Sequence, residues 1–270
     1  MTGPLAGVAL AAGRGERMRP LTDTLPKGLM PLADSTLLDL ALDRLAAHVA
    51  GGSATSAVNA HYLADLVRER VALRATVSQE EPQALGTAGA LGRLRPWLDG
   101  RDVLLTNADV YQPGDLGVLV DGWDGERCRL LVGDTLPGRR TDFWTSEGAP
   151  VRYVGSCLLP WSAVRDLEAA PSGLYEVLWR ALDSRGELDL VRLAAGRMSI
   201  DCGTPADYLA ANLHASGGAS VIGVGAVVEG AVERCVVWPG GYVGPDETLR
   251  EVVRAGSRER PLTVDARQVT

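Results

Sequence analysis

The chain has 270 residues, of which 46% are hydrophobic and 23% charged, a composition typical of a soluble globular protein. Its net charge of −7 argues against nucleic acid as a partner, because binding a phosphate backbone needs a basic face. There is no run of about 18 apolar residues and no secretory leader pattern, so we expect a cytoplasmic protein without a membrane span. The four cysteines are scattered, so neither structural zinc nor a disulfide is expected.

The first half of the chain alternates aliphatic runs with helical patterns. Residues 5–12 are expected to form a buried strand that leads into a glycine-rich loop at 13–20. A helix opened by an N-cap at Ser35 is expected over 35–48, where leucines recur at helical spacing. Further strands are expected at 57–59, 73–77 and 102–106, and further helices at 63–71 and 88–98. This alternation predicts an α/β fold, with a mostly parallel sheet and helices on both of its faces.

The pattern changes towards the C-terminus. Strands are expected within 130–159 and at 189–193, and the stretch 198–205 is expected to be a strand that ends in a turn. Helices are expected at 175–184 and, behind Pro205, at 206–215. From Val221 to Leu249 an aliphatic residue recurs every five or six positions, with glycines between. This periodicity is typical of a parallel β-helix, here of about two coils, and a glycine-rich β-meander is the alternative. We therefore expect a domain at 1–215, a short left-handed β-helix at 216–256, and a frayed or surface-bound tail at 257–270.

The loop after the first strand, Gly13-Arg-Gly-Glu-Arg-Met-Arg-Pro20, combines glycine with three arginines in an acidic protein. It fails the dinucleotide-binding fingerprint, because Met18 stands where the third glycine belongs, and it fails the P-loop, because no Gly-Lys-Ser/Thr follows. Backbone N–H groups exposed by glycine can cradle phosphate, and arginine can bind phosphate oxygens bidentately. The loop is therefore interpreted as a phosphate-binding loop, and a solvent-exposed turn is the alternative.

Three further residues are candidates for phosphate chemistry. Lys27 is the only lysine among the 27 basic residues, which indicates a need for a compact ammonium or else chance retention. Asp109 and Asp201 each stand at the end of an expected strand, where ligands of α/β sheets bind. Mg²⁺ prefers few protein oxygens together with phosphates, so the two aspartates are candidate ligands, although aspartate at a strand end also commonly forms turns.

Together the loop and the lysine give the pattern G-x-G-x-R-x-x-P-L-T-x-x-x-P-K, which resembles the signature of the sugar-1-phosphate nucleotidylyltransferases. Other stretches of that family follow in its order: L-G-T-A-G-A at 85–90, Y-V-G-S at 153–156 and D-C-G-T-P at 201–205. The stretch R-R-T-D-F at 139–143 is similar to the G-R-G-D-F of its N-acetylmuramate-1-phosphate uridylyltransferase subgroup. The resemblance covers residues 5–215, and the overall pattern is most similar to short uridylyl- and guanylyltransferases.

The resemblance implies a Rossmann-like enzyme that condenses a nucleoside triphosphate, UTP or GTP, with a sugar 1-phosphate, and that uses Mg²⁺. The implied catalytic residues are Arg17, Lys27, Asp109 and Asp201, with the two aspartates as metal ligands. The implied nucleotide-binding residues are Leu10, Ala12, Gly13, Gly15, Arg17, Lys27, Glu81 or Gln79, Gly86, Thr87 and Asn107. The implied acceptor-binding residues are Arg140 or Arg139, Asp142, Gly155 and Glu176. A lysine that many members carry before the acceptor strand is absent, which leaves the acceptor in doubt.

Other functions stay open at this stage. The same fold could transfer a cytidylyl group to a phosphonate or phosphocholine-like acceptor. A non-catalytic regulatory homologue would usually have lost the loop arginine, the lysine or a metal aspartate, and all four are present. A nicotinamide-dependent oxidoreductase is disfavoured by the missing glycine. A short β-helix with open ends often serves as an interface, so a homo-oligomer formed through it is a further expectation.

Overall fold

The computed structural model describes residues 4–135, 138 and 140–267, so the candidate Arg139 lies outside the described residues. The chain divides into two compact units. The first contains Met1–Gly13, Ala41–Ala108 and Gln112–Ser199, and the second contains Arg14–Leu40, Asp109–Tyr111 and Ile200–Thr270. The chain therefore passes between the units several times, so neither unit is one continuous stretch of the sequence.

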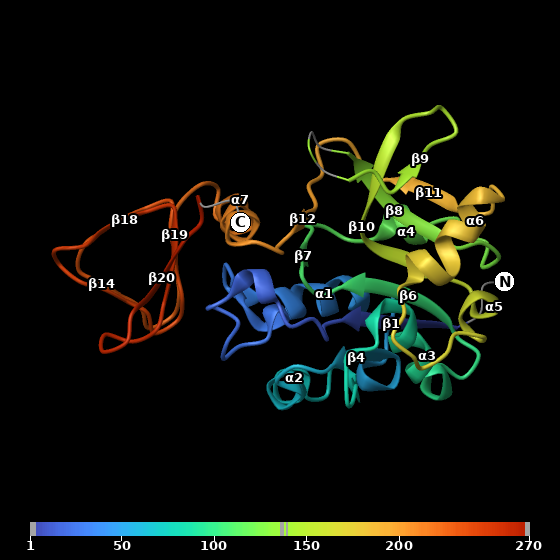
Figure 1. Ribbon diagram of the computed structural model, residues 1–270, viewed down its shortest axis with the longest axis horizontal. Helices are drawn as coiled ribbons and strands as arrows, with labels where there is room; N and C mark the ends of the chain where they lie inside the picture. Colours follow the sequence, from blue (N-terminus) through green and yellow to red (C-terminus); the bar gives the residue numbers. More distant parts are fainter. Residues whose placement is uncertain (1–3, 136–137, 139, 268–270) are drawn as a thin grey trace. The chain divides into compact units, whose positions relative to one another are not determined.

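The first unit is built on a sheet in which the strands follow the order β11-β8-β10-β6-β1-β4-β5, with β9 beside β10 (Figure 1). The strands are β1 Leu5–Leu10, β4 Ser56–Ala60, β5 Thr76–Gln79, β6 Asp102–Asn107, β8 Arg129–Asp134, β9 Phe143–Trp144, β10 Pro150–Leu159 and β11 Asp189–Arg192. Strand β1 runs parallel to β4 and β6, and β4 runs parallel to β5. Strand β10 runs antiparallel to β6 and β8. The expected mostly parallel sheet is confirmed.

Helices cover both faces of this sheet, as expected. They are α1 Leu37–Ala46, α2 Ala64–Val71, α3 Gly86–Leu98, α4 Gly117–Val120, α5 Trp161–Val164 and α6 Arg180–Ser184, with the 3₁₀ turn η3 Gly52–Ala54 and the π-helix η4 Tyr175–Trp179. Ala6 and Val8 of β1 share a buried core with Leu91 of α3. The residue between them, Gly7, faces Leu45 of α1. Successive strand residues point to opposite faces, so α3 and α1 lie on opposite sides of β1.

The start of α1 corrects one sequence expectation. The helix begins at Leu37, and the hydroxyl of Thr36 accepts the Asp39 N–H at 3.1 Å and donates to the Asp39 carboxylate at 2.6 Å. The expected N-cap at Ser35 is therefore wrong by one residue, because this reciprocal side-chain cap belongs to Thr36. Ser35 instead lies in the short strand β3 Ser35–Thr36, which pairs with β2 Pro31–Leu32.

The second unit contains the glycine-rich loop and the last part of the chain. Before the C-terminal coil its remaining elements are the 3₁₀ turns η1 Glu16–Met18 and η2 Lys27–Leu29, the strands β7 Val110–Tyr111 and β12 Ile200–Asp201, and the helix α7 Pro205–Ala215. Helix α7 starts at Pro205 because the Thr204 hydroxyl accepts the Asp207 N–H at 3.2 Å. Tyr208 of this helix is fully buried in the core that also contains Met18, and its hydroxyl donates to the Pro31 carbonyl oxygen, so α7 packs against β2.

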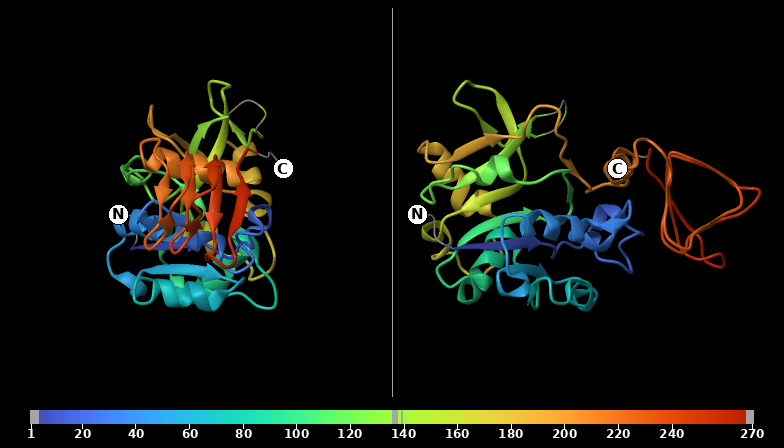
Figure 2. Two further views of the ribbon diagram at one scale, coloured as in Figure 1. Left: turned by 90° about the vertical axis from the view of Figure 1, so that its left-hand side faces the viewer. Right: turned by 180° about the vertical axis from the view of Figure 1, so that it is seen from behind.

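Beyond α7, short parallel strands stack in successive coils (Figure 2), which confirms the expected β-helix region. The strands are β13 Val221–Ile222, β14 Val227–Val228, β15 Ala231–Glu233, β16 Val236–Val237, β17 Tyr242–Val243, β18 Thr248–Arg250 and β19 Val252–Ala255. Val221, Val236 and Val253 lie in register in three of them. A Cβ atom on Gly230 would overlap backbone carbonyl oxygens of the next coil, so glycine lets the coils stack closely.

The segment expected to be a tail also contains regular structure. Strand β20 Leu262–Asp265 pairs antiparallel with β19, with Val264 opposite Val253. The β-helix therefore ends on a paired strand at this side, and its left-handed sense stays a prediction. Within the described ranges, no helix is long and apolar enough to cross a membrane.

Candidate active site

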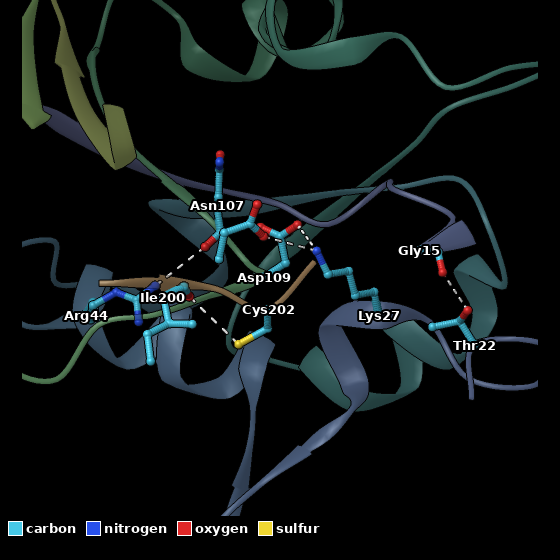
Figure 3. A network of polar contacts seen from close by, with 9 residues as sticks. Gly15, Thr22, Lys27, Arg44, Asn107, Asp109, Ile200 and Cys202 are labelled. Atoms are coloured by element: carbon cyan, nitrogen blue, oxygen red, sulfur yellow. Dashed lines mark hydrogen bonds and ion pairs between the residues drawn. The ribbon is translucent and has the colours of Figure 1, made fainter. Parts of the chain in front are cut away.

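Lys27 lies between two carboxylates of the second unit (Figure 3). Its ammonium Nζ is 2.7 Å from Oδ2 of Asp109 and 3.4 Å from Oδ1 of Asp201. The lysine is buried, with 8% of its surface exposed. The side chains of Asp109 and Asp201 are 34% and 56% exposed, so solvent still reaches both carboxylates. The structure thus brings together three residues that the sequence assigned separately to the reaction.

Charge outweighs burial in setting the protonation of Lys27. Burial lowers the pKa of the ammonium, because a low-dielectric environment penalises the charged form. The attraction of Asp109 and Asp201 and the hydrogen bond to Asp109 exceed this effect, and the pKa of Lys27 is raised above its ordinary value of 10.5. Lys27 is therefore a cation at neutral pH, which can offset phosphate charge and cannot act as a general base.

Backbone pairing holds the two aspartates beside each other. Asp201 is the last residue of β12 and lies opposite Val110 of β7, and the Cys202 N–H donates to the carbonyl oxygen of Asp109 at 3.0 Å. The thiol of Cys202 is fully buried, which raises the pKa of Cys202 to about 12 and keeps it neutral. The carboxylates are therefore fixed by the backbone and not by side-chain contacts alone.

The donor set can be tested against a metal ion. No group of three or more His, Cys, Asp or Glu placed to hold a metal ion occurs in the described part of the chain. Asp109 and Asp201 offer only oxygen and remain partly open to solvent. Mg²⁺ in nucleotide sites is bound by one or two carboxylates, with phosphate and water supplying the other ligands. The pair therefore fits Mg²⁺ bound together with a triphosphate, and it does not fit a structural zinc site.

The two glycines of the loop differ in whether the surrounding structure leaves room for a side chain. Gly15 has a φ of +65°, and a Cβ atom there would lie 3.1 Å from Cβ of Lys27 and 3.0 Å from Cγ2 of Thr22. The Thr22 hydroxyl also donates to the Gly15 carbonyl oxygen at 2.8 Å (Figure 3). Gly13 has no atom within 4 Å of its Cβ position. Only Gly15 is thus required by the fold of the loop around the lysine, and the roles of both glycines toward phosphate stay predictions.

The loop arginines differ in their surroundings. A Cβ atom on Gly203 would lie 2.6 Å from Nη2 of Arg17 and 3.2 Å from Oδ1 of Asp201. The guanidinium of Arg17 therefore lies beside the same segment as one of the carboxylates. Arg19 forms an exposed ion pair with Asp23, with 3.3 Å between Nε and Oδ1. Of the two, Arg17 is the better placed to act on a bound phosphate.

In the first unit, the segment expected to read the base packs against the backbone of residues 172–174. Gly86 has a φ of +71°, and a Cβ atom there would lie 2.6 Å from the Ser172 carbonyl oxygen. The Thr87 hydroxyl accepts the Leu174 N–H at 2.8 Å. Gly86 is therefore required by backbone packing whether or not a base approaches it. The roles of Gly86, Thr87 and the exposed Glu81 in nucleotide binding stay predictions.

Two buried polar residues of this unit were missed by the sequence reading. Glu80 is fully buried, whereas its neighbours Gln79 and Glu81, the two proposed base readers, hydrogen bond to each other at the surface. Arg44 is also buried, and its Nη2 donates to the Thr106 hydroxyl at 3.2 Å. The same nitrogen donates to the Asn107 carbonyl oxygen at 3.5 Å (Figure 3). Neither could be found from local sequence, because both partners of Arg44 and the Asn59 partner of Glu80 are distant in the chain.

Three further nucleotide-binding candidates lie at or just after strand ends. Leu10, the last residue of β1, lies opposite Asn59 of β4 on one side and opposite Asn107 of β6 on the other. The chain proceeds outward from β1 through β4 to β5 and then returns to β6 on the other side of β1. Ligands of α/β sheets bind outside the carboxyl ends of the strands at such a reversal. Leu10, Ala12 and Asn107 thus lie at the edge where a ligand is expected.

Two of the acceptor candidates, Arg140 and Asp142, lie beside aromatic residues of the first unit. Asp142 accepts the Tyr153 N–H at 3.0 Å, and Nε of Arg140 is 3.6 Å from Oδ1 of Asp142. The guanidinium carbon of Arg140 lies 5.2 Å from the ring centre of Tyr175, which immediately precedes Glu176. Gly155 has a φ of +93° within an irregularity of β10. The structure therefore brings Arg140 and Asp142 together, and it supplies aromatic surface that the sequence reading did not include.

Comparison with known proteins decides the family. A family model described as nucleotidyl transferase matches residues 6–125. The chain is 33% identical over 214 residues to N-acetylmuramate alpha-1-phosphate uridylyltransferase of Caulobacter vibrioides, a match that covers 68% of this chain and 87% of that protein. The chain belongs to the sugar-1-phosphate nucleotidyltransferase family. The protein of the same name from Neisseria meningitidis serogroup B is 35% identical over 178 residues, covering 63% of this chain and 71% of the relative.

A solved structure extends this similarity of fold to the C-terminal coil. The structure named mannose-1-phosphate geranyltransferase from Thermus thermophilus matches with a TM-score of 0.69, over 98% of this chain and 96% of that chain, at 18% identity. As a sugar-1-phosphate nucleotidyltransferase, the chain is an enzyme, and the oxidoreductase and the non-catalytic homologue are no longer needed as alternatives. The substrates of the family are a nucleoside triphosphate and a sugar 1-phosphate.

Proposed function

We propose that this nucleotidyltransferase transfers a uridylyl group from UTP to a sugar 1-phosphate of the N-acetylmuramate 1-phosphate type, in a reaction that requires Mg²⁺. The observation that carries the proposal is the cluster of Lys27, Asp109 and Asp201, a buried cation between two solvent-accessible carboxylates. The two relatives named above as uridylyltransferases support UTP as the nucleotide. GTP, the other nucleotide favoured by the sequence pattern, is the first competitor to test.

The chemistry requires position and charge more than proton transfer. An oxygen of the sugar 1-phosphate attacks the α-phosphorus of UTP, a new P–O bond forms, and the bond from the α-phosphorus to the bridging oxygen breaks, so that pyrophosphate leaves. The attacking phosphate is already ionised at neutral pH, so no side chain has to remove a proton. Lys27 supplies a fixed positive charge to the phosphates, because its pKa keeps it protonated. Arg17 adds a second positive charge for the leaving pyrophosphate.

Asp109 and Asp201 would hold the metal ion. Mg²⁺ supplies Lewis-acid stabilisation of the phosphate oxygens when it is bound. The carboxylates position that charge, since β7 and β12 fix their backbones side by side. Lys27 in turn limits the repulsion between the two carboxylates before the substrates arrive. Each of the three residues is therefore assigned a role in charge placement, and none is assigned a covalent step.

The acceptor assignment rests on the aromatic cluster. Phe143 is buried, with its ring centre 5.7 Å from that of Tyr175 and 6.5 Å from that of Trp179. Tyr175 is the partly exposed ring of this cluster, and the guanidinium of Arg140 lies over it, so Tyr175 is the ring that a sugar can reach. We assign Arg140 to the acceptor phosphate, in place of the lysine that many relatives have, and Glu176 to a sugar hydroxyl. The carboxylate of Glu176 folds back over Gly173, so it would have to turn to reach a sugar.

The proposal is tested by a substrate screen with the purified protein. Pyrophosphate release is measured with each of five nucleoside triphosphates against a panel of sugar 1-phosphates, and products are identified by mass. We expect the highest kcat/KM with UTP and N-acetylmuramate 1-phosphate, and no reaction without Mg²⁺. Preference for GTP with mannose 1-phosphate would overturn the base and acceptor, and release only with CTP and phosphocholine or a phosphonate would support the cytidylyl alternative. Absence of release with every pair would overturn the activity.

The expected homo-oligomer stays a prediction. The first coil of the β-helix exposes Val224, at 88% of its surface, together with Ile222 and Val227. Exposed aliphatic side chains on an unpaired strand edge favour association with a second edge. Light scattering should give the mass of a dimer or larger assembly, and Val224→Glu should reduce it to one chain.

A further inference from the structure

A chain of buried hydrogen bonds crosses three strands of the first unit at their carboxyl ends. The Ala11 N–H donates to Oδ1 of Asn59 at 2.7 Å, and Nδ2 of Asn59 donates to Oε1 of Glu80 at 2.8 Å. The other oxygen of Glu80, Oε2, accepts the Leu85 N–H at 2.7 Å. Asn59 is 3% exposed and Glu80 is 0% exposed, so both side chains of this relay are shielded from water.

The relay joins Ala11 to Leu85, which are 74 residues apart in the chain. Ala11 directly follows β1 and lies two residues before the glycine-rich loop, and Leu85 directly precedes Gly86, the first residue of α3. Asn59 stands in β4 between them, opposite Leu10 of β1 and Ser78 of β5. Both segments leave the sheet at its carboxyl edge, next to the reversal of strand order where ligands bind.

The direction of every hydrogen bond in the relay is determined. A backbone N–H can only donate, so Ala11 requires the oxygen of Asn59 to face it, and the amide nitrogen must then face Glu80. Both oxygens of Glu80 accept from donors that cannot reverse, the Asn59 amide and the Leu85 N–H. A buried donor left without its acceptor costs the full loss of hydration, so the three groups hold one geometry.

We propose that Asn59 and Glu80 are positioning residues that set the base-binding geometry of the nucleotide site. They fix the backbone after β1 relative to the backbone before α3, and these two stretches border the ligand edge. The inference rests on the proposed function, since it assigns to this edge the base of the nucleoside triphosphate. Glu80 touches no substrate, because it has no exposed surface. Its contribution passes through the Leu85 backbone and through Asn59.

Three variants separate this role from a general contribution to folding. Glu80→Gln keeps size but turns one of two acceptors into a donor, which then meets the Asn59 amide or the Leu85 N–H. Asn59→Asp keeps size and places oxygen against the oxygens of Glu80. The double variant Asn59→Asp/Glu80→Gln restores every hydrogen bond with the middle one reversed: the new carboxylate accepts from Ala11 and from the new amide, whose oxygen accepts from Leu85.

The primary measurement is the dissociation constant of UTP with Mg²⁺ and without acceptor, by calorimetry, together with KM values for both substrates. Each single variant should weaken UTP binding about tenfold and narrow the preference for UTP over CTP, with KM for the sugar 1-phosphate unchanged. The double variant should return to within about threefold of the parent protein.

Asp102→Asn is the matched control, because Asp102 is also a buried carboxylate that accepts a backbone N–H, that of Trp161 at 2.7 Å. It lies at the first position of β6, away from the carboxyl edge. This control should lower the melting temperature without changing UTP affinity.

Two results would overturn the proposal: single variants that behave like Asp102→Asn, with lower stability and full UTP affinity, or a double variant that does not recover. If the single variants fail to fold, the folded double variant decides the matter, since the proposal requires that it bind UTP with nearly parental affinity. A parent protein that neither binds nor converts any nucleoside triphosphate would overturn the proposed function as well. A parent protein that is active with UTP, together with single variants of unchanged affinity, would overturn the positioning role alone.

Discussion

Two polar clusters of the molecule use hydrogen bonds and charge in opposite ways. In the relay of Asn59 and Glu80, every side-chain oxygen and nitrogen has a hydrogen-bond partner, and both side chains are buried. In the cluster around Lys27, the cation is buried, but its two aspartate partners keep 34% and 56% of their side-chain surface exposed. One cluster is complete as it stands, and the other has carboxylate oxygens free to bind something further.

This difference indicates what each cluster does. A satisfied buried network stabilises one backbone geometry and gains nothing from a ligand. The two carboxylates beside Lys27 keep exposed oxygens, which are suited to a divalent cation with phosphate ligands. The relay is therefore assigned to positioning and the Lys27 cluster to chemistry. Variants of the Lys27 cluster should mainly lower kcat, whereas variants of the relay should mainly weaken nucleotide binding.

Replacement of Lys27 should produce the largest single-residue effect outside the metal ligands. Lys27→Ala removes the fixed charge, so kcat for pyrophosphate release should fall about 10²–10³-fold, the range typical of a lost group that stabilises developing charge. Because the pKa of Lys27 is raised above 10.5, the parent enzyme should show no loss from lysine deprotonation up to about pH 9. The aspartates can hydrate once the ammonium is removed, so circular dichroism should remain unchanged. A Lys27→Ala variant with near-parental kcat would contradict the assignment.

Substitution of the two loop glycines should have smaller effects than Lys27→Ala, and the effects of the two substitutions should differ from each other. Gly15→Ala places a methyl group 3.1 Å from Cβ of Lys27 at a φ of +65°, so it should displace the lysine stem. We expect KM for the nucleotide to rise about tenfold. The free energy of unfolding should fall by about 1–2 kcal/mol. Gly13→Ala meets no neighbouring atom within 4 Å and should leave the melting temperature unchanged. Equal melting temperatures for the two variants would show that the loop has more room than the structure indicates.

The smallest effect is expected for chemical modification of the cysteine thiols in the native protein. All four cysteines are buried, and burial raises the pKa of Cys128 and of Cys202 to about 12. Only the thiolate reacts readily, and it is favoured above the pKa, so iodoacetamide at about pH 8 should label none of the thiols in the native protein. All four should react after unfolding, as mass spectrometry would show. Rapid labelling of native Cys202, with loss of activity, would mean that the segment beside Asp201 opens in solution.

Much of the fold could be predicted from sequence, because aliphatic runs and helical periodicity depend on nearby residues. The first strand, expected at 5–12 and formed at 5–10, the helix ending at Leu98 and the helix behind Pro205 follow from such patterns. Boundaries were less accurate: β5 begins at Thr76, and α1 is capped by Thr36 and not by Ser35. The cap required knowledge of which hydroxyl faces the first turn, which spacing alone does not give.

The candidate site divides in the same way. Lys27, Asp109 and Asp201 could be nominated because each stands at a recognisable place, a retained lysine or a strand end. Glu80 could not, because its burial depends on Asn59 and Leu85, which the fold brings to it. Its exposed neighbours carried the same types of side chain and were nominated in its place. Sequence patterns locate groups that act on substrates more readily than groups that position the backbone beneath them.

The most direct test of the central claim is the Mg²⁺ dependence of pyrophosphate release, compared among the parent enzyme, Asp109→Asn and Asp201→Asn. These substitutions keep side-chain size and remove one charge from the metal site. Each variant should lose at least about 10²–10³-fold in kcat and need a higher Mg²⁺ concentration for half-maximal rate, while the exposed control Asp246→Asn should match the parent. Parental rates and an unchanged Mg²⁺ dependence in both active-site variants would contradict the claim.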